Sequence, residues 1–248
     1  AAEKLQAAGI IPFAHGGQAW QDATVFEAVA MGIGGNNYYK NCYVDLKETC
    51  LRSETTVKVF DQMRKLQGFT DEGSPGRDWN VATGMVIEGK AGFQIMGDWA
   101  KGEFTAAGKV PGVDYYCAAT PSNNGYLYNV DSFIFYKTSD PDKQEGQKLL
   151  AKLMMGKNFQ KVFNLYKGSI PARLDVPMDE FDKCAKTSNS DIKTAGASGG
   201  LVPSFAHGMA QGNTMKAALQ DVITEHFNSD MSSVDAANAL ADSVLDNM

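Results

Sequence analysis

Cysteine and histidine are the residue types most suited to metal binding and redox chemistry, and in this sequence the two types lie far from each other. None of the four cysteines belongs to a Cys-x-x-Cys pair; they are Cys42, Cys50, Cys117 and Cys184. The three histidines lie well away from them along the chain, at His15, His207 and His226. Zinc sites usually draw such ligands from short, regular spacings, so we predict no metal site and no cofactor. Four cysteines allow one or two disulfides in three full pairings, and buried free thiols are the alternative.

Other signatures of chemistry are weak. The sequence lacks the Gly-x-x-x-x-Gly-Lys-[Ser/Thr] pattern of a phosphate-binding loop. A net charge of −6, with no run of lysine and arginine, argues against a surface for nucleic acid. No apolar stretch approaches the roughly 18 to 20 residues that span a bilayer. The composition, 44% hydrophobic and 21% charged, is that of an ordinary globular domain.

The elements that would position functional side chains alternate between strand and helix, which predicts the α/β class. Short apolar runs predict strands at 10–14, 90–96, 115–120 and 131–137. Apolar residues at helical spacing, together with Gly stops, predict helices at 1–8, 55–68 and 79–88.

Three further helices are predicted in the second half of the chain. Asp140-Pro141 is a typical N-cap and first-position pair, and the helix it starts should bury Leu149, Leu153 and Phe159. Two closing helices carry apolar residues at helical spacing: Met215, Leu219, Val222 and Phe227 in one, and Val234, Ala237, Ala241 and Val244 in the other. The polar, Gly/Ser-rich region 186–200 is predicted to be a surface loop.

Two strings within these elements carry a family resemblance. The first is Gly-Lys-Ala-Gly-Phe at 89–93, followed by Gly-Asp-Trp at 97–99. The second is Gly-Ser-Ile-Pro-Ala-Arg at 168–173, which comes after a Ser-Asp-Pro-Asp helix start at 139–142. In this order and at these separations, they resemble the carboxy-terminal portion of the family of extracellular sugar-binding proteins that includes maltose- and glucose-binding proteins. The resemblance covers nearly the whole chain.

The resemblance implies the two-lobed fold of type II periplasmic binding proteins, in which each lobe is a sheet flanked by helices and a sugar occupies the cleft. It implies that residues 1–128 and 172–248 form the second lobe, without its first elements. Residues 129–171 would then be a strand–helix excursion that belongs to the first lobe, most of which is absent. The chain is therefore expected to be a fragment that by itself binds glucose weakly or not at all. The expected protein partners are a second copy of the chain or an N-terminal segment present as a separate chain.

Sugar recognition needs an aromatic ring against the apolar C–H face of a pyranose, and polar groups for its hydroxyls. The resemblance implies that Trp99 stacks on the sugar and that Asp131, Lys167 and His207 hydrogen-bond to it. Trp20 is a further residue that could line the cleft. Other roles stay open: Trp99 packed in a hinge, Asp131 capping a turn, Lys167 complementing a helix dipole, and a structural His207.

The function implied is non-catalytic binding of a neutral monosaccharide, glucose first and galactose next, for delivery to the permease subunits of an ABC importer. The implied location is periplasmic or extracellular, with a lipid-anchored form as an option. Two alternatives stay open: a carbohydrate-processing enzyme, and a self-associating module that binds no sugar. A glycosidase needs two carboxylates roughly 5 to 10 Å apart, and Asp131 is the single acidic candidate.

Overall fold

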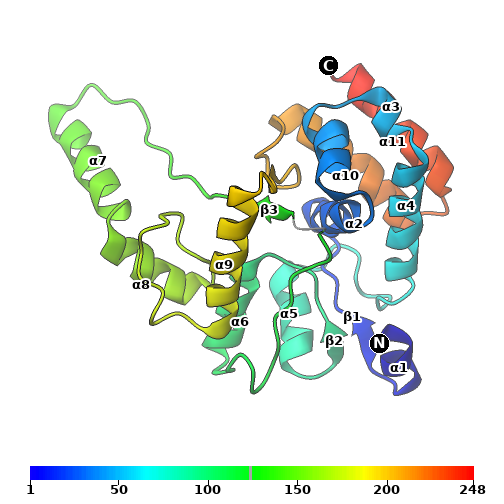
Figure 1. Cartoon of the computed structure of the whole chain (residues 1–248), viewed down its shortest axis with the longest axis horizontal. Coiled ribbons are helices and arrows are strands. Elements are labelled where there is room, and N and C mark those ends of the chain that lie inside the picture. The colour runs from blue at the N-terminus through cyan, green and yellow to red at the C-terminus, as the bar shows by residue number, and fades with distance from the viewer. Residues whose placement is uncertain (123–124) are drawn as a thin grey trace. The chain divides into compact units, whose positions relative to one another are not determined.

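The computed structural model describes residues 1–122 and 125–248, and it divides the chain into two compact units (Figure 1). The first unit consists of Ala1–Gly97, Ala118–Asn129 and Asp191–Met248. The second unit consists of Asp98–Cys117 and Val130–Ser190. Each unit is therefore assembled from segments that are distant in sequence.

The first unit is helical with two short pairs of strands. Its helices are α1 (Ala2–Ala7), α2 (Ala19–Tyr39), the π-helical turn η1 (Lys40–Val44), α3 (Glu48–Leu51), α4 (Glu54–Gln67), α5 (Trp79–Ile87), α10 (Asn213–Asn228) and α11 (Ser233–Asp246). Its strands are β1 (Ile11–Phe13), β2 (Ala91–Phe93), β3 (Tyr126–Tyr128) and β4 (Leu201–Pro203). Strand β1 pairs with β2 and strand β3 pairs with β4, both in parallel.

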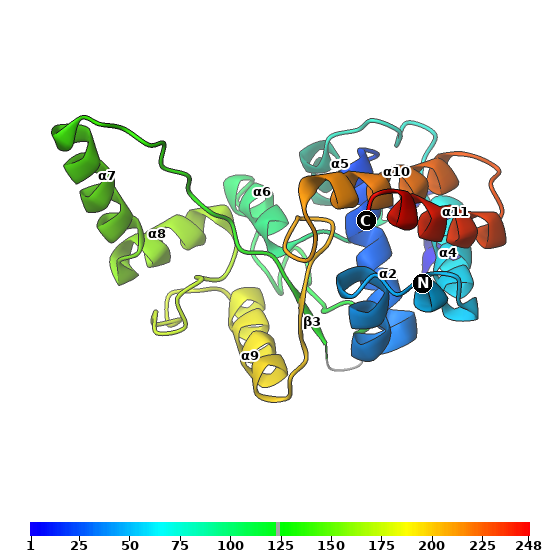
Figure 2. The ribbon, with the colours of Figure 1, turned by 90° about the horizontal axis from the view of Figure 1, so that it is seen from above.

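The main core of the first unit lies among α2, α4, α10 and α11, which pack against one another (Figure 1, Figure 2). Large apolar and aromatic side chains fill it, and the fully buried ones include Phe26, Tyr39, Tyr43, Phe60, Phe205, Leu219 and Leu240. Such burial is the main favourable term in folding, at roughly 25 cal/mol per Å² of apolar surface. These helices therefore form a rigid base for the loops between them.

The second unit is smaller and less well buried. It contains the 3-10 turn η2 (Asp98–Ala100), α6 (Lys101–Ala106), α7 (Pro141–Met154) and α8 (Lys157–Lys167). Helix α9 (Lys183–Ala197) begins in this unit, and its residues from Asp191 onward belong to the first unit. A small core of Val176, Phe181 and Ala185 packs with Leu165, Ile170 and Met178.

All four cysteines are paired. Cys42–Cys50 joins η1 to α3 in the first unit, and Cys117–Cys184 joins the segment after α6 to the first turn of α9 in the second. The alternative of free thiols is wrong. Disulfides persist mainly in oxidising compartments, so this pairing fits a protein outside the cytoplasm.

Most predicted helices are confirmed. Helices α4 and α5 lie where the spacing placed them, and the four apolar residues predicted for α10 are buried. Helix α7 starts after Asp140, whose side chain accepts hydrogen bonds from the amides of Asp142 and Lys143. Helix α11 buries three of its four predicted residues, whereas Val234 is exposed.

Two of the predicted strands are wrong. Residues 131–137 form no strand, and Phe133, Ile134, Phe135 and Tyr136 are all exposed. Residues 115–120 make only an isolated bridge, between Pro111 and Tyr115. A strand exists only when a neighbouring strand takes up its backbone hydrogen bonds, and no described strand lies alongside either segment.

Two further predictions are wrong: the burial of Leu149 and Leu153, and the surface loop at 186–200. Leu149 and Leu153 are exposed, and they line an open groove with residues of α8 in place of a closed core. The region 186–200 is largely helix α9 rather than a loop. Asp182 explains this: its carboxylate accepts a hydrogen bond from the amide of Ala185 (2.8 Å), as an N-cap residue does, and Ala185 and Ala195 are buried.

Candidate functional site

Trp99, Asp131 and Lys167 all belong to the second unit. Trp99 is half-buried in the turn η2, directly after Asp98. The Asp98 carboxylate accepts a hydrogen bond from the amide of Ile170 (3.1 Å), which ties this turn to the loop that follows α8. Burial raises the pKa of Asp98, while hydrogen bonds from Ser169 and Ile170 act in the opposite direction.

The structure brings Asp131 and Lys167 together. Lys167 is the last residue of α8, and its ammonium group forms an ion pair with the Asp131 carboxylate. The same ammonium lies 5.8 Å from the centre of the Phe163 ring. The Asp131 side chain is 61% exposed and that of Lys167 is 27% exposed, so this pair is accessible to a ligand.

Two glycines let the Trp99 turn and the end of α8 come close. Gly168 follows Lys167 in a left-handed conformation (φ 88°). A Cβ atom on Gly168 would lie 2.5 Å from the amide nitrogen of Gly102, and one on Gly102 would lie 2.8 Å from the carbonyl oxygen of Lys167. Real Cβ atoms essentially never lie within 3.0 Å of such backbone atoms. A side chain at either position would therefore push α6 and α8 apart.

His207 lies in the first unit, beside Trp20 and Thr24 of α2. The rings of Trp20 and His207 have centroids 5.8 Å apart and are tilted by 60°. Thr24 Oγ1 is 3.2 Å from Nε2 of His207 and 2.8 Å from the carbonyl oxygen of Trp20. The Thr24 hydroxyl donates to that carbonyl, which leaves its oxygen able to accept a hydrogen bond from a protonated Nε2 of His207.

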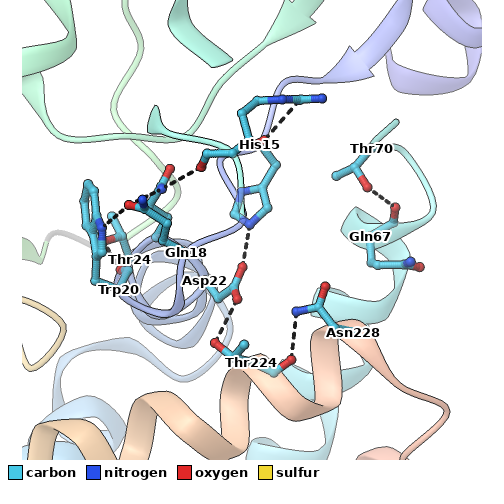
Figure 3. Close-up of polar contacts among 11 residues, drawn as sticks. His15, Gln18, Trp20, Asp22, Thr24, Gln67, Thr70, Thr224 and Asn228 are labelled. Carbon is cyan, nitrogen blue, oxygen red and sulfur yellow. Dashed lines mark hydrogen bonds and ion pairs between the residues drawn. The ribbon is translucent and has the colours of Figure 1, made fainter. Parts of the chain in front are cut away.

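Trp20 is also held by Gln18 (Figure 3). The indole Nε1 donates to the amide oxygen of Gln18 (2.8 Å), and Gln18 Nε2 donates to Asp78 (2.6 Å). The sequence prediction missed Gln18 and Thr24. A signal was present for Thr24, because Trp20 and Thr24 are four residues apart and therefore share a face of α2.

One buried acid–base pair in the first unit is unsuited to catalysis. His15 Nε2 lies 2.6 Å from Asp22 Oδ1, and Thr224 donates to the other carboxylate oxygen at 2.8 Å (Figure 3). The side chains of His15 and Asp22 are 2% and 0% exposed. A substrate cannot reach them, so the contacts tie the start of α2 to α10.

A second catalytic motif in the sequence, at 196–200, does not have the backbone geometry that catalysis requires. Residues 196–200 read Gly-Ala-Ser-Gly-Gly, which matches the Gly-x-Ser-x-Gly spacing of a hydrolase nucleophile elbow, a match that the sequence prediction overlooked. An elbow leads from a strand into a helix, whereas here helix α9 leads into strand β4. The Ser198 hydroxyl donates to the carbonyl of Ala195 (3.2 Å), as expected at a helix end.

No group of three or more potential metal ligands gathers among the residues that the structure describes. None of the helices in that part of the chain combines the length and the apolarity needed to cross a bilayer.

Comparison with known proteins identifies the family. Residues 1–154 match the model of the bacterial extracellular solute-binding proteins. The chain belongs to this family. A protein of Brucella suis biovar 1 (strain 1330), described as a probable sugar-binding periplasmic protein, is 46% identical over 243 residues. The match covers 98% of this chain and 57% of that relative, so the chain spans little more than half of its length.

Solved structures share the fold. A chitin oligosaccharide binding protein aligns with a TM-score of 0.71 and 16% identity, over 99% of this chain and 62% of that one. A bacterial solute receptor described with an exclusive substrate preference for b-D-galactopyranose aligns with a TM-score of 0.69 and 16% identity, over 99% and 63%. The predicted α/β solute-binding fold is thus confirmed.

Family membership also settles the general class of protein. The family consists of extracellular solute-binding proteins, so membership supports the predicted class, a binding protein outside the cytoplasm. The four predicted sugar-binding residues are not tested by the comparisons, and they remain a prediction. The structure brings two of them, Asp131 and Lys167, into direct contact.

Proposed function

We propose that this chain binds a neutral monosaccharide, glucose or galactose, for delivery to the permease subunits of an ABC importer. The observation that carries the proposal is the accessible ion pair of Asp131 and Lys167, in the unit that also holds Trp99. Its family and a close relative described as sugar-binding support the same class of ligand.

The chemistry of the pair suits a sugar. A carboxylate accepts hydrogen bonds and an ammonium donates them, and hydrogen bonds to charged groups are stronger than those between neutral groups. Two adjacent hydroxyls of a pyranose, each both donor and acceptor, can satisfy the pair together. Because the two charges cancel, the pair favours a neutral ligand over an ionic one. Trp99 would supply the flat apolar surface for the C–H face of the ring.

We further propose that His207 donates or accepts a sugar hydrogen bond and that Trp20 lines the same region of the first unit. Residues 129–171 would belong to one lobe of the whole protein, and residues 1–128 and 172–248 to the other. The protein would be periplasmic, either free or lipid-anchored.

A specific surface favours self-association as a second activity. An apolar groove of about 550 Å³ on the second unit is lined mainly by Leu149, Leu153, Phe159 and Val162. Exposed apolar surface of this kind commonly marks an interface. Sedimentation velocity over a range of concentrations tests it: a Leu149→Glu, Leu153→Glu variant should shift the protein toward monomer, and a monomeric wild type would refute the interface.

Sugar titrations test the binding function. Glucose and galactose should raise the melting temperature and give saturable signals in ligand-detected NMR, since a ligand that binds only the folded state stabilises it. Trp99→Ala and Lys167→Met should abolish both effects. Trp79→Ala is the matched control, because Trp79 is also half-buried but lies on α5 of the first unit.

The outcomes separate the alternatives. Equal binding in Trp99→Ala and Trp79→Ala would remove Trp99 from the site. Turnover of a disaccharide would favour the carbohydrate-processing enzyme. No response to any neutral sugar would refute monosaccharide binding by this chain.

A further inference from the structure

The loop that carries His207 is held by an unusual set of contacts. It joins β4 to α10, and three successive amides in it each donate to a buried side chain. The amide of Phe205 donates to the hydroxyl of Tyr39 (3.1 Å), and that of Ala206 donates to the carboxylate of Glu27 (3.3 Å). The amide of His207 itself donates to the hydroxyl of Ser204 (3.1 Å).

Tyr39 and Ser204 are each also bonded to Glu27, and we name these three residues the anchor cluster. The Ser204 hydroxyl lies 2.7 and 2.9 Å from the two carboxylate oxygens of Glu27. The Tyr39 hydroxyl lies 3.0 Å from Glu27 and 3.1 Å from the carbonyl of Pro203. A continuous network therefore runs from helix α2 to the backbone of His207.

This network is costly to bury. Glu27 is 3% exposed, and Ser204 and Tyr39 are 1% and 0% exposed. No cation contacts Glu27 among the described residues. Burial accordingly raises its pKa to about 7, although hydrogen bonds from Ser204, Ala206 and Tyr39 act the other way. An apolar side chain would fill the same core position without this cost. What the carboxylate adds is a fixed backbone at 204–207.

We propose that the anchor cluster positions His207 for ligand binding, with Glu27, Tyr39 and Ser204 acting as positioning residues that do not touch the ligand. This inference rests on the proposed role of His207 in sugar binding. The contacts fix three consecutive amides, while the imidazole stays beside Trp20 and Thr24.

Two neighbouring tyrosines on α2 provide a matched test. Tyr39→Phe removes a hydroxyl of the anchor cluster. Tyr38→Phe removes a hydroxyl that instead bonds to Tyr43 (2.9 Å) and Thr56 (2.8 Å), and not to Glu27, Ser204 or the amides of 205–207. Ser204→Ala is a second variant inside the cluster, in case Tyr39→Phe folds poorly.

The first readout is independent of sugar. In Tyr39→Phe and Ser204→Ala, the amides of 205–207 should exchange hydrogen about tenfold faster than in wild type, and the NMR signals of the His207 ring should shift. Tyr38→Phe should leave both unchanged. Equal exchange rates in Tyr39→Phe and Tyr38→Phe would overturn the proposal.

The second readout is sugar affinity, which should fall about five- to tenfold in Tyr39→Phe but not in Tyr38→Phe. Combined with His207→Ala, the Tyr39→Phe substitution should have no further effect, because residues that act through one another are not additive. Additive losses would overturn the proposal. If wild type binds no sugar, the binding function fails, and the exchange rates and His207 signals still decide whether the cluster holds the loop.

Discussion

Replacing His226 by leucine should stabilise the protein, although the residue is fully buried. His226 lies in the last turn of α10, with its ring 4.8 Å from that of Phe60. Neither ring nitrogen has a hydrogen-bond partner among the described residues. Burial lowers the pKa of His226 to about 4; the nearby Arg64 guanidinium adds to this effect and Asp61 opposes it. The folded protein therefore holds a neutral, unpaired imidazole.

The expected magnitude follows from these two features. A buried polar group without a partner costs about 1 to 3 kcal/mol, so His226→Leu should add about 1 kcal/mol at pH 7 after imperfect packing is allowed for. Below about pH 6.5 the unfolded chain takes up a proton that the folded chain refuses, so wild-type stability falls toward pH 4. The difference between 6.5 and about 4 corresponds to at most about 3 kcal/mol. Because the folded protein can relax and admit water around a charged imidazole, the measured loss should be about 1 to 2 kcal/mol.

Urea unfolding at several pH values between 4.5 and 7 measures both effects. His226→Leu should raise the midpoint at pH 7 and flatten the loss of stability on acidification. His226→Gln is the control, because it cannot titrate but keeps a buried polar group; it should flatten the pH dependence without the gain at pH 7. A less stable His226→Leu with an unchanged pH dependence would refute the reasoning.

Three other substitutions test separate parts of the structure. Burial raises the pKa of Glu27 to about 7, so in wild type this group adds stability that is complete below about pH 4.5 and is lost as the pH rises through 7. Glu27→Gln removes that contribution. In the same urea series, the variant should therefore lose stability more steeply than wild type as the pH falls. Gly168→Ala should cost about 1 to 3 kcal/mol through backbone strain at φ 88° and should weaken sugar binding by displacing Lys167, as measured by thermal melts with and without sugar. Leu219→Ala, in the main core, should cost about 2 to 5 kcal/mol in urea unfolding, with no pH dependence.

The helices were predictable where local signals were strong. Apolar spacing in α4 and α10, and the Asp140-Pro141 start of α7, depend on residues within a few positions of one another. Helical hydrogen bonds and caps are equally local, so the sequence alone specifies them. The family resemblance likewise depends on strings of a few residues, and it identified the class of protein correctly.

Contacts between distant segments were not predictable in this way. The short apolar run at 131–137 predicts a strand, but a strand requires a partner, and the described chain supplies none. Leu149 and Leu153 have the spacing of buried residues but are exposed, because the groove that they form with α8 stays open. For α9, the cap at Asp182 was the available signal, and the polar composition concealed it.

The sequence by itself determined the family, three of the four helices of the main core (α4, α10 and α11, but not α2) and the types of residue suited to a sugar. The tertiary structure decided which of those residues meet. Asp131 and Lys167 are 36 positions apart, and Glu27 and Ser204 are 177 apart. Nothing local signals such pairs, because only folding brings the distant segments together. For the buried pair of Glu27 and Ser204, the packing also excludes water and so strengthens the contact.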